Sequence, residues 1–237
     1  MTPDDLRENM VATYFTLRGG LVLLSFAFPV ILYFYSAHAY GELNESSISA
    51  FYGADAGRMR NYFVGTLCII GALLVMYKGF SVFENWMLKA AGVSAILVAT
   101  TPCDCWHPLD GHDHWHTAFA LAFFACMVMV CEFCAFDTIT LLPKTQQKWF
   151  GRAYHLISVF LIVSPAGAVL AANMANVPSD GLFFIEWFGV WMFALYWATK
   201  SAEFHITAAE KRALKGELKK VKGYGLAPVT PSSPSSE

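Results

Sequence analysis

Charged side chains are scarce in this chain. Only 14% of its 237 residues are Asp, Glu, Lys or Arg, against about 25% in a typical soluble domain. This scarcity excludes an ordinary soluble domain, and the formal net charge of −2 provides no basic surface for a nucleic acid. The first ten residues, MTPDDLRENM, also lack the basic start of a secretory signal peptide. We therefore expect the first apolar run to be retained as a membrane span.

The chain is rich in apolar residues, which make up 56% of it. A bilayer core about 30 Å thick needs about 20 apolar residues per helix. Six runs approach this length, at about 19–40, 62–80, 87–102, 116–142, 153–174 and 183–204. The sequence therefore predicts an all-α, polytopic membrane protein, with a six-helix transmembrane bundle over residues 1–206. Over residues 207–237 we expect a basic cytoplasmic helix followed by a disordered Pro/Ser tail.

Lysine and arginine are distributed unevenly among the loops. If the N-terminus is cytoplasmic, all but two of the 16 Lys and Arg residues lie on the cytoplasmic side, and the two exceptions are Arg58 and Arg60. This asymmetry follows the positive-inside rule. It predicts that both termini are cytoplasmic and that residues 103–116 face the extracytoplasmic side of the membrane.

The segment from 103 to 116, CDCWHPLDGHDHWH, concentrates side chains that bind metals. Imidazole and thiolate together favour zinc or copper over magnesium or calcium. The candidate ligands are Cys103, Cys105, His107, His112, His114 and His116. Two alternatives stay open: a strained disulfide between Cys103 and Cys105, or polar interface residues that bind no metal. The other four cysteines lie in the apolar runs, where we expect them to pack as small hydrophobic residues.

A carboxylate interrupts the last apolar run, GLFFIEWFGVW, at Glu186. A charge inside a span is costly unless it is paired or faces a wet cavity. The topology puts Arg60 and His116 at the same membrane face, so Arg60 is the first candidate partner and His116 the second. This face predicts a pocket for a lipid head group, with arginine as the fork-shaped donor, formed by Arg58, Arg60, Glu186, His38 and His116. A simple Arg60–Glu186 ion pair is the compatible structural alternative.

At the opposite face, acids and bases occur together and are expected to neutralise one another. They are Glu132, Asp137, His155, Lys200, Glu203 and His205. Four histidines, His38 and His116 outside and His155 and His205 inside, also raise the alternative of two haems held between helices. Haem is disfavoured because these histidines lie at helix ends and no small residues make room for a porphyrin.

Several short motifs resemble the six-helix membrane proteins grouped loosely with the DRAM/Sfk/Frag superfamily. They are RNYFVG (60–65), YKGF (77–80), AGVSAILVATTP (91–102), HTAFALAFF (116–124), the EW pair at 186–187, and Lys200 at the end of the sixth run. The resemblance implies a six-helix bundle with cytoplasmic ends and a connection with lipid remodelling, lipid organisation or autophagy. It implies no set of catalytic residues, and the segment 103–116 departs from the family pattern.

These observations favour a non-enzymatic membrane protein that binds or organises lipid head groups. Three alternatives stay open. The first is a metal-dependent membrane hydrolase in which Glu186 or Asp104 acts as base on a metal-bound water. The second is a redox or copper-handling protein, and the third is an accessory subunit of a larger membrane complex. The expected partners are membrane lipids, with a second membrane protein or another copy of the chain as further candidates.

Overall fold

The computed structural model describes residues 2–43, 45–54, 58–102, 114–172, 181–221 and 225–229. Within these ranges, six helical segments are long and apolar enough to cross a membrane, which confirms the predicted number of spans. The long helices are α1 (Pro3–Tyr40), α2 (Arg58–Met76), α3 (Val82–Thr100), α4 (His114–Met129), α6 (Lys144–Ala172) and α7 (Gly181–Thr207). The fourth span continues from α4 through a π-helical turn, η3 (Val130–Cys134), into α5 (Phe136–Ile139).

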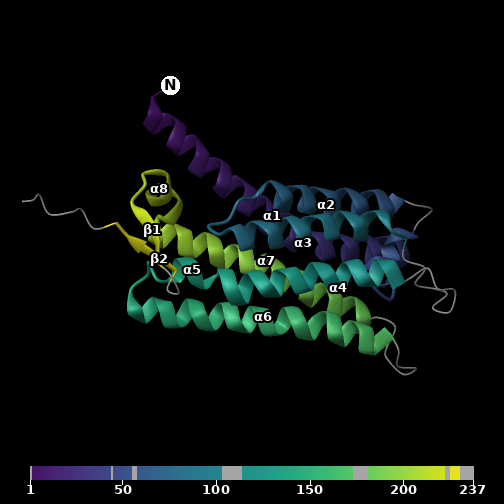
Figure 1. The fold of residues 1–237 in the computed structure, drawn as a ribbon. Helices are drawn as coiled ribbons and strands as arrows, with labels where there is room; N and C mark the ends of the chain where they lie inside the picture. Colours follow the sequence, from purple (N-terminus) through teal and green to yellow (C-terminus); the bar gives the residue numbers. More distant parts are fainter. Residues whose placement is uncertain are drawn as a thin grey trace, which may run out of the picture.

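The six long helices form a closed ring. Each packs on the next in the order α1, α2, α3, α4, α6 and α7, and α7 packs back on α1. Figure 1 shows them running side by side along one axis. We call one end of this bundle the η1 end, after the short helix η1 (Ser49–Tyr52), and the other the α8 end, after α8 (Ala209–Leu214). Among the described Lys and Arg residues, only Arg58 and Arg60 belong to the η1 end.

Helix α1 begins 16 residues earlier than the apolar run predicts. Thr2 is its N-cap: the Thr2 hydroxyl accepts from the backbone N–H of Asp5 at 3.2 Å, and the Asp5 carboxylate accepts from the Thr2 N–H at 2.7 Å. This capping box satisfies two N–H groups that a helix start otherwise leaves unpaired. The resulting helix of 38 residues is about 57 Å long, and its first turns extend beyond the bundle at the α8 end (Figure 1).

The second span ends four residues earlier than predicted, at Met76, because side chains organise the connection to α3. Ser81 caps α3 by accepting from the Glu84 N–H at 3.1 Å. The Glu84 carboxylate in turn accepts from the Phe80 N–H at 2.7 Å, and the Asn85 side chain accepts from the Gly79 N–H at 2.8 Å. The last two bonds replace the helical bonds that the N–H groups of Gly79 and Phe80 would otherwise make.

Beyond α7, the described residues form a short helix and a hairpin. Helix α8 has only six residues and ends before Gly216, which has a positive φ of 71°. The chain then forms an antiparallel hairpin of β1 (Leu218–Val221) and β2 (Gly225–Pro228). The Thr140 hydroxyl donates to the Leu226 carbonyl at 2.7 Å and fixes the hairpin to the bundle.

Candidate functional site

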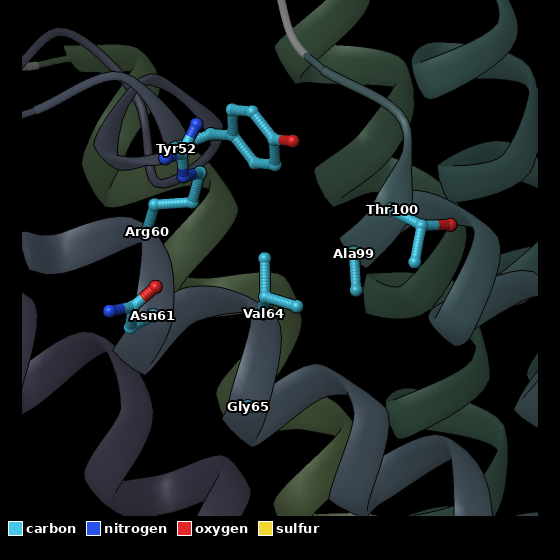
Figure 2. A pocket seen from close by; sticks show the side chains of 7 residues that line it. All are labelled: Tyr52, Arg60, Asn61, Val64, Gly65, Ala99 and Thr100. Atoms are coloured by element: carbon cyan, nitrogen blue, oxygen red, sulfur yellow. The ribbon is translucent and has the colours of Figure 1, made fainter. Parts of the chain in front are cut away.

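A cavity of about 470 Å³ lies between α2 and α3 at the η1 end. Figure 2 shows Arg60 and Tyr52 on one side of it and Ala99 and Thr100 of α3 on the other. The Val64 side chain extends from α2 into the space between them, and Gly65 follows one position later. Asn61 completes the lining. Among the residues that the structure describes, the wall therefore combines one cation and several hydrogen-bonding groups with a small apolar surface and has no carboxylate.

Two glycines explain why the helices separate here. A Cβ on Gly71 would lie 2.6 Å from the carbonyl oxygen of Gly92, so α2 and α3 touch backbone to backbone at this crossing. A Cβ on Gly65 would meet no atom within 4 Å. Gly65 lies six residues, or about 9 Å, nearer the η1 end. The helices are thus closely packed at Gly71 and leave open space at Gly65.

Arg60 is exposed, and its guanidinium lies 5.6 Å from the centre of the Tyr52 ring. This contact is a cation–π interaction, which orients the guanidinium without neutralising it. Among the described residues, no carboxylate lies within ion-pairing distance of Arg60. Its N–H groups therefore remain able to bind an anion at the mouth of the cavity.

The half-buried Glu186 of α7 and the buried His116 of α4 hold η1, and with it Tyr52, in place. The Glu186 carboxylate accepts from the Ile48 N–H at 2.7 Å. His116 Nδ1 lies 2.9 Å from the Thr101 carbonyl oxygen, and its Nε2 lies 3.0 Å from the Ser49 hydroxyl. Because a carbonyl only accepts, Nδ1 donates, and in the neutral ring Nε2 accepts from Ser49. Both residues thus support the wall of the cavity.

Of the five residues predicted for a head-group pocket, only Arg60 lines this cavity. Glu186 does not pair with Arg60, because it binds the backbone of the η1 segment instead. His116 is 3% exposed and lies behind η1. Arg58 and His38 are exposed at the same end but are not part of the lining. Tyr52, Asn61 and Thr100 were not predicted as site residues, although the motifs RNYFVG and AGVSAILVATTP contain Asn61 and Thr100.

The predicted metal ligands Cys103, Cys105, His107 and His112 lie outside the described residues. His114 begins α4, but its side chain is also outside the description. Both ring nitrogens of His116 are engaged in hydrogen bonds, so in this arrangement the ring is not a ligand. Within the described part of the chain, no group of three His, Cys, Asp or Glu side chains has a geometry that could hold a metal ion.

The four cysteines in the spans are free thiols, as expected for packing residues. Cys131 and Cys134 have the spacing C-x-x-C that redox and metal sites often use. Both lie in the π-helical turn η3, where they are 0% and 2% exposed. Their position in the main hydrophobic core supports a packing role.

A second polar cluster lies at the α8 end, where acids and bases were expected to neutralise one another. The Lys200 ammonium lies 3.3 Å from Glu203 Oε2, 2.7 Å from the Thr138 hydroxyl and 3.5 Å from the Ala135 carbonyl oxygen. The Tyr154 hydroxyl donates to the same Glu203 oxygen at 2.6 Å. The expected neutralisation is confirmed for this buried pair, and His155 Nδ1 lies 3.2 Å from Glu132 Oε1 in a more exposed contact. His205 is exposed at the end of α7.

No family model, curated protein or solved structure matches this chain. The geometry of the site is therefore the basis for proposing a function.

Proposed function

We propose that this protein is a multi-pass membrane protein that binds an anionic lipid head group in the cavity between α2 and α3. The observation that carries the proposal is the exposed Arg60 guanidinium, oriented by Tyr52 at the mouth of a cavity whose described lining residues include no acid. An arginine fork matches the oxygens of a phosphate. Val64, Gly65 and Ala99 provide the apolar surface that the first carbons of a lipid need.

The distribution of charge supports a location for this site. The η1 end carries only two of the described basic residues, whereas the α8 end carries the others. By the positive-inside rule, the η1 end faces the extracytoplasmic side and both termini are cytoplasmic. The proposed head group therefore belongs to the outer leaflet. The proposal is one of binding, without turnover.

Filling the cavity tests the proposal with little risk to the fold. In Gly65→Leu the new side chain enters open space, because a Cβ there meets nothing within 4 Å. The change also removes a glycine from a helix interior, which favours the helix by about 0.5–1 kcal/mol. Gly19→Leu is the matched control, since a Cβ at Gly19 of α1 also meets nothing within 4 Å.

The measurement is native mass spectrometry of purified protein after incubation with phosphatidylglycerol or phosphatidylcholine. We expect wild type and Gly19→Leu to retain phosphatidylglycerol, and Gly65→Leu to lose it. Arg60→Gln should weaken retention about tenfold or more, since it removes a charge-assisted hydrogen bond. Arg152 is an exposed arginine of α6, and Arg152→Gln should leave retention unchanged. Equal retention by wild type and Gly65→Leu would contradict the proposal.

A further inference from the structure

A second arginine, Arg18 of α1, is buried at the α8 end with 2% of its surface exposed. Side chains of the bundle hold its guanidinium on three sides. Nε donates to the Ser201 hydroxyl at 3.2 Å, Nη1 donates to the Tyr77 hydroxyl at 3.3 Å, and the Phe204 ring lies 4.9 Å away. None of these groups is an anion. The bundle thus orients the guanidinium but does not neutralise it.

The anion comes from α8. The Glu210 carboxylate binds both terminal nitrogens of Arg18, with Oε1 on Nη1 and Oε2 at 3.1 Å from Nη2. This two-pronged geometry is the one that guanidinium groups make equally with carboxylates and phosphates. Glu210 therefore occupies the position that the two oxygens of such a ligand would take.

The element that carries Glu210 is short and joins the preceding helix through a strained residue. Helix α8 has six residues, too few to be stable on its own in water. It joins α7 through Ala208, whose φ of 49° lies in the left-handed region that a Cβ disfavours. Its carboxylate can therefore exchange with another anion at Arg18, while the hairpin after α8 stays fixed through Thr140.

At the same end of the bundle, a cavity of about 480 Å³ lies between the first turns of α1 and α8. Its lining includes the basic side chains of Arg7, Lys211 and Lys215. Asp4, which is paired with Arg7 at 3.0 Å, Glu8 and Val11 complete the wall. Lys211 and Lys215 are exposed on α8. These lysines attract anions to the side of α8 that faces α1.

We propose that Arg18 is a second anion-binding site, for a carboxylate or a phosphate monoester, and that Glu210 of the C-terminal segment occupies it as an internal ligand. An incoming anion displaces the Glu210 carboxylate from the Arg18 guanidinium, while the hairpin after α8 stays fixed to the bundle. Some anion must be present at all times, because a buried guanidinium without a partner is strongly destabilising. This site is at the opposite end of the bundle from the cavity at Arg60 and does not depend on it.

The test compares Glu210→Gln with wild type in full-length protein held in phosphatidylcholine nanodiscs. The amide keeps the shape of the side chain but removes the competing charge. The matched control is Glu217→Gln, since Glu217 is an acid just after α8 that is 51% exposed and lies 3.9 Å from Arg212. Two probes separate the sources of the anion: inorganic phosphate, measured by calorimetry, and phosphatidic acid added to the nanodisc, measured by the shift in thermal unfolding.

We expect Glu210→Gln to bind at least one probe about tenfold more tightly than wild type or Glu217→Gln. Binding of inorganic phosphate indicates a soluble ligand, and a response to phosphatidic acid alone indicates a lipid head group. The double variant Arg18→Gln/Glu210→Gln should lose this gain. The proposal is overturned if Glu210→Gln binds both probes no better than wild type, or if the gain survives in the double variant. If the double variant does not fold, the comparison with Glu217→Gln decides.

Discussion

Replacing Lys200 with methionine tests whether the buried pair at the α8 end stabilises the fold. The Lys200 ammonium uses all three of its donors, and the Glu203 side chain beside it is 0% exposed. Methionine preserves most of the length of the side chain and removes the charge. Because Glu203 is then left as a buried anion without its cation, we expect Lys200→Met to lower the free energy of unfolding by about 3–5 kcal/mol.

The double variant Lys200→Met/Glu203→Gln separates the charge effect from packing. It removes both charges and keeps an amide oxygen for the Tyr154 hydroxyl, which donates to Glu203 at 2.6 Å in the native protein. The hydroxyl of Thr138 and the Ala135 carbonyl each lose a partner, at a cost of about 1 kcal/mol apiece. We therefore expect the double variant to recover about 2 kcal/mol of the loss.

The assay is reversible unfolding by SDS in mixed micelles, followed by the fluorescence of the buried Trp197, which is 1% exposed. Lys148→Met is the control, because Lys148 is an exposed lysine of α6. The buried pair does not stabilise the fold as expected if the single variant unfolds with a free energy within about 1 kcal/mol of wild type. The same conclusion follows if the double variant is no more stable than the single one.

Three further predictions follow from local geometry. Gly71→Ala should lower stability by about 1–3 kcal/mol, since its Cβ would lie 2.6 Å from the Gly92 oxygen, whereas Gly151→Ala, with its nearest atom at 3.5 Å, should be neutral in the same assay. Burial raises the pKa of Glu45, whose Oε2 has no hydrogen-bond partner among the described residues. The folded state therefore holds this proton more tightly, and stability falls as pH rises from the unfolded pKa through the folded one. Glu45→Gln should raise the thermal midpoint at pH 8 and leave it unchanged at pH 4, and an equal change at both values would count against the assignment. If residues 103–114 hold zinc or copper, elemental analysis should find the metal in wild type and not in the double variant Cys103→Ala/His112→Ala. This pair of substitutions leaves His116 and its support of η1 intact. Equal metal content in both proteins would rule out this metal site.

The six spans were predictable because a membrane helix can be recognised in the sequence from the length and hydropathy of its apolar run. The ends of the helices were less predictable, because they depend on local caps. The extension of α1 to Pro3 rests on two hydrogen bonds between Thr2 and Asp5. The early end of α2 depends on the side chains of Glu84 and Asn85, which bond to the backbone at 79–80. Such bonds do not alter the average hydropathy of a window.

The candidate site was only partly predictable for a related reason. Glu186 was expected to need a cation, but a backbone N–H satisfies its carboxylate. The sequence does not reveal which backbone N–H groups will lie near a given side chain. Tyr52 comes to Arg60 only because η1 folds back onto the bundle. Arg18 precedes most of the first apolar run and was assigned to the cytoplasmic interface. Its burial depends on Glu210, which is 192 residues away in the chain.

The most direct test of lipid binding at the η1 end is photocrosslinking with a phosphatidylglycerol that carries a diazirine near its head group. We expect labelled peptides from residues 60–65 and 99–100 in wild-type protein, and loss of this labelling in Gly65→Leu with the rest of the pattern unchanged. Labelling of these peptides to the same extent in both proteins, or labelling only elsewhere on the bundle, would contradict lipid binding in this cavity.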